Sequence, residues 1–230
     1  MKKNISYAFP RTLPVMFGYL FLGIAFGIVL EEAGYNFIWA FFISLFVYAG
    51  SMQFAMVPLL AGSVSVVTMA LTTLFVNFRH VFYGLSFIES FKKIKQQPYM
   101  IFSLTDETYS VLCGCKTLDP EEKNRNAWFW IALMDHSYWI TGSVLGGLLG
   151  EFLPVDFTGI DFSMTALFVV ILVEQILSNK KVNWIVALFG LACAAICLFV
   201  FGTEKFLLPS LISTVFLVFL FSRIKKEGKA

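Results

Sequence analysis

Charged residues are scarce in this sequence. Asp, Glu, Lys and Arg make up 14% of its 230 residues, whereas hydrophobic residues make up 58% and aromatic residues 17%. A soluble domain typically carries roughly 25% charged residues. No single globular core needs this much apolar surface, so the excess is expected to face lipid. The formal net charge of +2 is too small to indicate nucleic-acid binding. The composition predicts a polytopic integral membrane protein.

Residues that bind metals or act as nucleophiles are scarce as well. The two histidines are His80 and His136, and none of the four cysteines lies in a Cys-x-x-Cys zinc motif. Cys193 and Cys197 lie four residues apart in an apolar run and are expected to pack as small buried side chains. The sequence has no His-Glu-x-x-His motif, no Gly-x-Ser-x-Gly elbow and no Walker loop. We therefore expect no metal, no cofactor and no enzymatic activity.

A signal-peptide cleavage site is also missing near the N-terminus. The basic pair Lys2-Lys3 and the apolar run 13–30 resemble the start of a signal peptide, but no small-x-small site follows them. Further apolar runs come behind, so we interpret residues 13–30 as the first membrane helix.

Apolar segments recur along the whole chain, and a membrane-spanning helix takes about 20 such residues. The candidate spans are 13–30, 37–61, 64–88, 98–115, 127–150, 163–178, 183–201 and 206–221. Polar residues interrupt the second span at 48–53 and the third at 77–80. Irregular backbone at membrane depth requires protein or water around it, so these interruptions indicate broken or re-entrant helices. The sequence predicts an all-α transmembrane helical bundle with six to eight crossings and at least one such helix.

The distribution of Lys and Arg predicts the orientation, because cytoplasmic loops are enriched in these residues. Basic clusters occur at the N-terminus, 116–125, 180–181 and 223–229. Loops 31–36 and 151–161 contain no Lys or Arg and fit the outside. Both termini are therefore expected in the cytoplasm. Eight crossings place the lysines of 92–95 outside, and a re-entrant segment removes that conflict.

The chain is expected to form one transporter domain, residues 1–230, with a faint internal repeat of 1–115 and 116–230. The repeat rests on Gly23 and Gly27 in the first half and Gly142, Gly146 and Gly150 in the second. Many transporters are built from repeats. Glycines at this spacing also occur wherever helices pack closely, and both interpretations stay open.

The strongest polar cluster inside an apolar segment is Asn77, Arg79 and His80. An ionisable side chain at mid-bilayer costs about 2.5–3.5 kcal/mol on insertion scales, which makes each one a functional candidate. These residues need an acidic partner or a wet cavity, and Asp106 or Glu107 is the acidic residue nearest in sequence within a candidate span. Alternatively, Arg79 snorkels to the interface or closes a purely structural ion pair, without a role in transport. His80 is a candidate proton carrier or a structural donor.

A second cluster is the adjacent pair Asp106 and Glu107. Two carboxylates in a poorly solvated segment repel each other when both are ionised, which suits a proton-coupled site. The alternative is an amphipathic surface segment whose carboxylates remain in water.

The third cluster is the interruption at 48–53, which runs from Tyr48 to Gln53. Gly50 and Ser51 permit an unwound helix whose freed amides could hold a substrate carboxylate. Gln53 offers a further side-chain amide. A notch of small residues that serves helix packing is the alternative.

Two weaker polar pairs, Asp135-His136 and Glu174-Gln175, lie near predicted helix ends, where the membrane interface would solvate them. We expect no functional role for either pair. Four tryptophans near span ends are expected to act as interfacial anchors. They are Trp128, Trp130, Trp139 and Trp184.

Four motifs of the first half resemble, in this order, those of the azaleucine-resistance (AzlC-type) family, the large subunits of branched-chain amino acid exporters. They are Phe17-Gly18-Tyr19 with Gly27, then YAGSMQF at 48–54, NFRHVFYG at 77–84 and LTDE at 104–107. The resemblance extends over most of the chain and is densest between residues 14 and 107.

The resemblance implies a proton-coupled secondary exporter of leucine, isoleucine or valine, with methionine as a further candidate. It implies a small, very hydrophobic AzlD-type membrane subunit as partner, and a multi-pass location in the bacterial cytoplasmic (inner) membrane. Together with the broken segment, it assigns amino-acid binding to Tyr48, Gly50, Ser51, Gln53 and Asn77. It assigns proton coupling or an ion pair to Arg79, His80, Asp106 and Glu107. Met52 stands where small residues are more usual.

The main alternative is a passive channel or facilitator for small solutes, which would show downhill flux without accumulation. A membrane-embedded hydrolase that uses Asp106 and Asp135 is a second alternative. A scaffold for another subunit is the third.

Overall fold

The computed structural model describes residues 2–62, 64–118, 124–152, 180–202 and 206–227, together with a few single positions between 153 and 179. The described residues are almost entirely helical, and none of them lies in a β-strand. The all-α class is therefore confirmed. The candidate span 163–178, with Glu174 and Gln175, falls largely outside the described residues.

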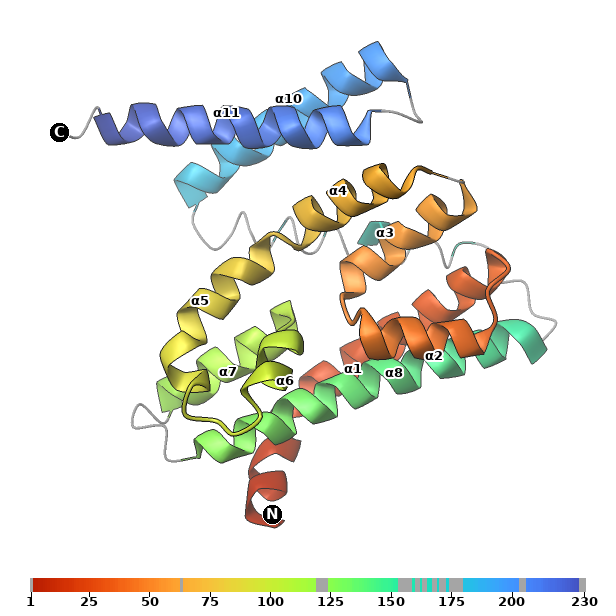
Figure 1. The fold of residues 1–230 in the computed structure, drawn as a ribbon, viewed down its shortest axis with the longest axis vertical. Helices are drawn as coiled ribbons and strands as arrows, with labels where there is room; N and C mark the ends of the chain where they lie inside the picture. Colours follow the sequence, from red (N-terminus) through yellow and green to blue (C-terminus); the bar gives the residue numbers. More distant parts are fainter. Residues whose placement is uncertain are drawn as a thin grey trace. The chain divides into compact units, whose positions relative to one another are not determined.

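The chain divides into two compact units. The first contains residues Met1–Val64 and Val76–Met164, and the second contains Ser65–Phe75 and Thr165–Ala230. Helices of the first unit are α1 (Lys2–Glu32), α2 (Phe37–Phe46), α3 (Gly50–Ala61), α5 (Arg79–Phe91), α6 (Gln97–Phe102), α7 (Asp106–Leu118), the short η1 (Arg125–Ala127) and α8 (Trp128–Phe152) (Figure 1). The second unit contains most of α4 (Val66–Asn77), and α10 (Lys180–Phe201) packed on α11 (Leu207–Glu227). The expected halves 1–115 and 116–230 stay a prediction.

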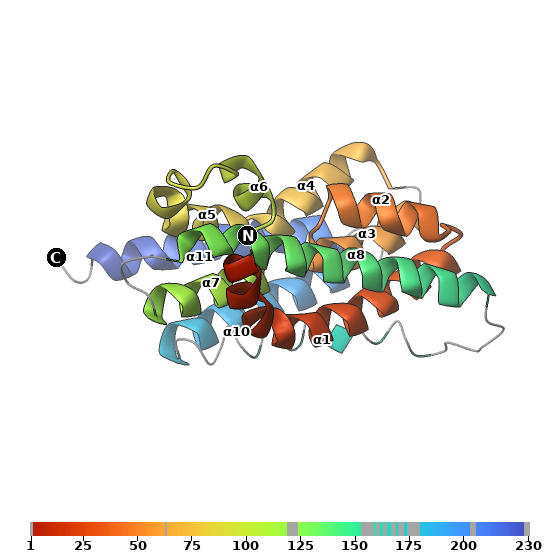
Figure 2. The same cartoon turned by 90° about the horizontal axis from the view of Figure 1, so that it is seen from below.

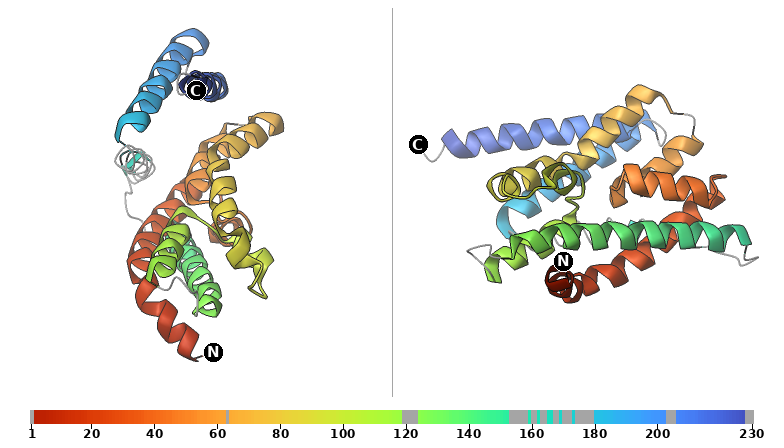
Figure 3. Two further views of the ribbon diagram at one scale, coloured as in Figure 1. Left: turned by 90° about the vertical axis from the view of Figure 1, so that its left-hand side faces the viewer. Right: turned by 60° about the horizontal axis from the view of Figure 1, so that its bottom comes forward.

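The two longest helices of the first unit, α1 and α8, pack along each other (Figures 2 and 3). Glycines line their contact. A methyl group added at Gly23 would lie 3.0 Å from the Cα atom of Gly142, and one at Gly27 would collide with the carbonyl oxygen of Ser143. Because only hydrogen atoms occupy these positions, the two backbones approach as closely as in small-xxx-small helix pairs. Close helix packing, one of the two interpretations of these glycines, is confirmed, and the internal repeat stays a prediction.

Three candidate spans are interrupted helices. α2 ends at Phe46 and α3 begins at Gly50, α4 ends at Asn77 and α5 begins at Arg79, and α6 ends at Phe102 and α7 begins at Asp106. The first two interruptions overlap the predicted ones at 48–53 and 77–80, although residues 50–53 are helical in α3, and the third is an addition. Apart from the six-residue α6, each of these helices has 10–13 residues. At 1.5 Å per residue they are about 15–20 Å long, roughly half the hydrocarbon core of a bilayer.

Within the described part of the chain, α1 is the one helix that is both long and apolar enough to cross a bilayer unaided. Spans 127–150, 183–201 and 206–221 correspond to α8, α10 and α11, which have 25, 22 and 21 residues. The predicted number of crossings, six to eight, stays a prediction.

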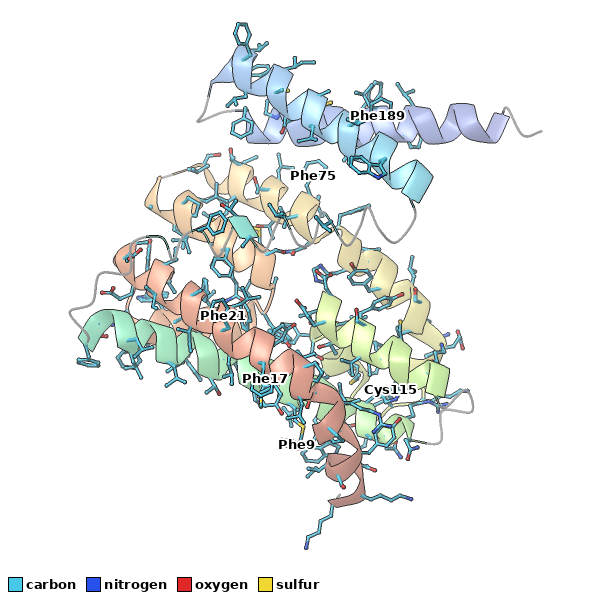
Figure 4. The ribbon with its side chains drawn as sticks, turned by 180° about the vertical axis from the view of Figure 1, so that it is seen from behind. Phe9, Phe17, Phe21, Phe75, Cys115 and Phe189 are labelled. Atoms are coloured by element: carbon cyan, nitrogen blue, oxygen red, sulfur yellow. The ribbon has the colours of Figure 1, made fainter. Side chains whose placement is uncertain are left out.

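The outer face of α1 carries large apolar side chains. Phe9, Phe17 and Phe21 lie along this face, and Phe17 and Phe21 are 69% and 71% exposed (Figure 4). Soluble monomers rarely leave a contiguous stripe of this kind in water. The stripe suits lipid, in agreement with the composition.

Replacing Gly27 by alanine is expected to destabilise the protein by about 1–3 kcal/mol, because the added methyl group has to push α1 and α8 apart. Gly18→Ala is the matched control on the same helix, since no atom of the described residues outside its own stretch of helix lies within 4 Å of its Cβ position. The measurement is the midpoint of thermal unfolding of the purified protein in detergent. Equal midpoints for the two variants would contradict the packing argument.

Candidate functional site

A group of buried polar side chains surrounds the break between α2 and α3. α8 passes this break and contributes Asp135, His136 and Trp139, which lie within little more than one helical turn. We name this group the polar network. It consists of Tyr19, Ser44, Tyr48, Gln53, Tyr99, Thr105, Glu107, Thr108, Asp135, His136 and Trp139.

Gln53 makes hydrogen bonds that connect the chain segments on both sides of the break. Its Oε1 atom accepts hydrogen bonds from the Trp139 indole N–H at 2.9 Å and from the Ala49 backbone N–H at 3.1 Å. Its Nε2 atom donates to the Ser44 hydroxyl at 3.2 Å. Gly50 lets the Trp139 ring come close, because a methyl group there would lie 3.2 Å from the ring. One amide thus joins the end of α2, the start of α3 and the middle of α8.

Tyr48 lies in the break with a φ angle of +40°, in the left-handed region that residues with a side chain rarely adopt. Its ring stacks on the His136 ring with 4.1 Å between centroids. The His136 Nε2–H donates to the Ser44 carbonyl oxygen at 3.1 Å, and Nδ1 pairs with the Tyr99 hydroxyl at 3.0 Å. Since a carbonyl oxygen only accepts, Nε2 carries a hydrogen in this contact.

A line of hydroxyl groups connects two carboxylates, Asp135 of α8 and Glu107 of α7. The Thr108 hydroxyl donates to Asp135 Oδ2 at 2.9 Å, and the Thr105 hydroxyl donates to that of Thr108 at 3.2 Å. The Tyr19 hydroxyl lies 2.6 Å from that of Thr105 and donates to Glu107 Oε2 at 2.7 Å. Five oxygen atoms from three helices and the loop before α7 therefore follow one another at hydrogen-bond distance.

The start of α7 explains part of this arrangement. Thr105 caps the helix, because its hydroxyl oxygen accepts the Thr108 backbone N–H at 3.3 Å. Asp106 and Glu107 occupy the first turn, where the helix dipole favours negative charge. Both acidic side chains are half-buried. Glu107 belongs to the polar network, and Asp106 is its neighbour in the same turn.

Asp135 Oδ1 is buried and has no hydrogen-bond partner among the described residues. The Tyr48 hydroxyl oxygen is buried as well, and the hydroxyl groups of Tyr19 and Thr108 lie beside it. Asp135 is 0% exposed, and no described cation pairs with it. Tyr48 neighbours Asp135. A buried polar atom without a partner costs about 1–3 kcal/mol, so Asp135 Oδ1 is suited to receive a ligand.

The structure brings together Tyr48, Gly50 and Gln53, three of the residues expected to bind substrate. Ser51 is buried in the first turn of α3. Their role as ligands stays a prediction, and the Gln53 amide is occupied within the protein.

Asn77 and His80 lie at the junction of α4 and α5. The His80 Nδ1 atom lies 3.0 Å from the Asn77 carbonyl oxygen, and the Asn77 side-chain oxygen is buried without a partner among the described residues. Arg79 begins α5, and its side chain lies outside what the structure describes. The predicted ion pair of Arg79 with a carboxylate stays a prediction.

The expectation that the interface solvates Asp135 and His136 is wrong. Both side chains are buried, because Asp135 packs against Thr108 of α7 and His136 packs against the break between α2 and α3. The tryptophan prediction is also wrong for Trp128 and Trp139, which are 1% and 2% exposed. Trp139 uses its N–H inside the polar network, whereas Trp184 is exposed. His136 follows Asp135 by one residue and Trp139 follows it by four, so the three side chains lie on one side of α8. This spacing is the sequence signal that could have grouped them.

Comparison with known proteins gives the family. The sequence matches the family described as AzlC protein over residues 14–153, more than half of the chain. The chain belongs to the AzlC family. A Bacillus subtilis protein named branched-chain amino acid transport protein AzlC is 36% identical over 209 residues, which are 90% of this chain and 80% of the relative. All residues of the polar network fall inside the matched range.

Two further relatives of this AzlC-family chain are named as membrane proteins. An uncharacterized membrane protein of Helicobacter pylori (strain 26695) is 39% identical over 226 residues, 96% of each chain. The inner membrane protein YgaZ of Escherichia coli K12 is 29% identical over 196 residues, 82% of this chain and 79% of the relative. No solved structure matches the chain. The exposed apolar face of α1 and the names of these relatives lead to the same conclusion. The protein is a membrane protein.

Trp139→Phe is expected to destabilise this AzlC-family protein, because it removes the N–H that Gln53 accepts and leaves a gap beside Gly50. The lost hydrogen bond alone is worth about 0.5–1.5 kcal/mol. Trp184→Phe on the exposed side of α10 is the matched control and is expected to change stability by less than about 0.5 kcal/mol. Thermal unfolding in detergent compares the two. A control variant that loses as much stability as Trp139→Phe would count against the anchoring role.

Proposed function

We propose that this protein exports branched-chain amino acids from the cytoplasm. Leucine, isoleucine and valine are the expected substrates, with methionine as a further candidate. Export is secondary active transport driven by protons. The substrate class rests on the name of the Bacillus subtilis relative, a branched-chain amino acid transport protein. The chain works in the bacterial inner membrane with both termini in the cytoplasm, and a small AzlD-type membrane subunit is its partner.

The observation that supports an amino acid as cargo is the unpartnered Asp135 Oδ1 atom, which has the Tyr48 hydroxyl as a neighbour. A primary ammonium group has three N–H donors and carries a positive charge. It would supply the buried Asp135 with both a hydrogen bond and a counter-charge. Hydrogen bonds of this charge-assisted kind are about twice as strong as neutral ones. The carboxylate of the amino acid would then lie toward the start of α3, where a helix N-terminus favours negative charge.

Aromatic rings next to this position suit an aliphatic side chain. Trp139 packs edge-on against Tyr19 at 5.3 Å and stacks on Phe26 at 6.3 Å between centroids. Phe26 in turn meets Phe54 at 5.7 Å. Ligand sites of small molecules are mostly apolar with a few placed polar groups, and this combination fits leucine better than a polar amino acid.

The direct test follows efflux from bacteria that lack their own exporters. The cells are loaded with leucine-containing dipeptides, and leucine, isoleucine, valine and methionine are measured outside. The chain is expressed with and without the small partner subunit, and with and without an uncoupler. We expect efflux that requires both subunits and stops with the uncoupler.

Each other outcome of the efflux test has a defined meaning. Downhill efflux that ignores the uncoupler would favour a passive channel or facilitator. No efflux of any of the four amino acids, with both subunits present in the membrane, would reject the substrate class.

Tyr48→Phe is expected to raise the leucine concentration needed for half-maximal efflux by about tenfold to a hundredfold. It removes one hydrogen bond to a charged group, worth about 1.5–3 kcal/mol. Tyr35→Phe is the matched control, because Tyr35 lies in the loop after α1 and contacts Trp39. An unchanged half-maximal concentration in Tyr48→Phe would show that this hydroxyl does not touch the substrate.

A further inference from the structure

We propose that the oxygen chain from Glu107 to Asp135 holds one shared proton and is the path along which the coupling proton reaches the substrate site. This inference rests on the proposed proton-coupled export and names residues for it. Its members are Glu107, Tyr19, Thr105, Thr108 and Asp135.

A count of hydrogens carries the argument. The five oxygen atoms make four contacts of 2.6–3.2 Å, and each contact needs one hydrogen. Tyr19, Thr105 and Thr108 each contribute one hydroxyl hydrogen, and an ionised carboxylate contributes none. Tyr19 uses its hydrogen to donate to Glu107, Thr105 to donate to Thr108, and Thr108 to donate to Asp135. The contact between Tyr19 and Thr105, the shortest of the four, is then left without a hydrogen.

One additional proton completes the chain, and it has two places to sit. If Glu107 carries the proton, it donates to Tyr19, and every hydroxyl donates onward toward Asp135. If Asp135 carries the proton, it donates to Thr108, and every hydroxyl donates in the opposite direction toward Glu107. All hydroxyl groups are neutral in both arrangements, and one carboxylate is ionised in each.

Moving the proton between these arrangements takes four transfers of one hydrogen each. Glu107 gives its proton to Tyr19, Tyr19 gives its own to Thr105, Thr105 gives its own to Thr108, and Thr108 gives its own to Asp135 Oδ2. No bond other than O–H forms or breaks. The negative charge moves from Asp135 to Glu107.

The position of Asp135 makes this transfer a coupling step. An ionised Asp135, fully buried and without a described cation, attracts the substrate ammonium proposed above. A protonated Asp135 is neutral and no longer offers that counter-charge. Arrival of the proton therefore weakens the hold on the substrate, and its departure restores it. Proton and substrate compete for one carboxylate.

The described titratable groups around this chain come from several neighbouring elements. Tyr48 of the break, Tyr99 of α6 and Glu107 of α7 face Asp135, and His136 follows it on α8. Asp106 neighbours Glu107 on α7. Glu107 is half-buried and Asp135 is fully buried, which makes Glu107 the end through which protons enter and leave.

The test uses the protein with its partner subunit in liposomes and separates proton-driven from proton-independent transport. Thr108→Val keeps the shape of the side chain and interrupts the chain of hydroxyls. It is expected to reduce proton-driven leucine accumulation to the level seen with an uncoupler, while leucine–leucine exchange, which needs no net proton movement, continues. Thr108→Ser keeps a hydroxyl and is expected to accumulate leucine. Thr141→Val is the control, because Thr141 is exposed on α8 and bonds within its own helix.

A second readout works without transport and even where Thr108→Val fails to fold. Infrared spectroscopy of the wild-type protein is expected to show the carbonyl stretch of a protonated carboxyl group near neutral pH, and Asp135→Asn and Glu107→Gln are expected to change it. Undiminished accumulation by Thr108→Val, or a wild-type spectrum without this band, would overturn the relay. If leucine exchange is absent in the wild type, the proposed function fails instead, and the infrared result still decides whether the shared proton exists.

Discussion

The close approach of α1 and α8 is the constraint on which the rest of the site depends. Their backbones meet where Gly23 lies against Gly142. One turn away, Tyr19 and Trp139 therefore meet ring to ring. From that position Tyr19 reaches the start of α7, and Trp139 reaches Gln53 in α3. If α1 and α8 lay farther apart, Tyr19 and Trp139 would no longer reach their hydrogen-bond partners. The glycines therefore set the geometry of polar groups that they do not touch.

The sequence predicts the features that depend on local chemistry. The predicted helix breaks within 37–61 and 64–88 are confirmed. They can be predicted because glycine, serine, glutamine and arginine inside apolar runs rarely face lipid. The buried Gln53 and the half-buried acidic pair at 106–107 are also recognisable from their neighbours. Asp135 and His136 are misjudged, because burial depends on which helices pack against α8, and one sequence does not reveal that packing. Thr105 and Thr108 look like an ordinary helix cap and gain significance only through contact with Tyr19 and Asp135.

Gln53 shows how a correct choice of residue can come with a different expected role. An amide both donates and accepts, which suits it to bind an amino acid and equally to tie together three chain segments. In this structure its oxygen accepts hydrogen bonds from Trp139 and Ala49, and its nitrogen donates one to Ser44. Asp135, by contrast, keeps a buried oxygen without a described partner. The geometry therefore shifts the centre of the site from the amide of α3 toward the carboxylate of α8.

The backbone conformation and the side-chain contact of Tyr48 favour different residue types. Its backbone angle of +40° is one that glycine or asparagine adopts at little cost, whereas its ring stacks on His136 and only an aromatic side chain can do the same. In evolutionary terms, few residues can replace it: a substitution that relaxes the backbone loses the stack, and one that keeps the stack retains the strain. Variation at this position is therefore expected to be narrow and confined to aromatic residues, and a glycine there would be accompanied by a compensating change at position 136.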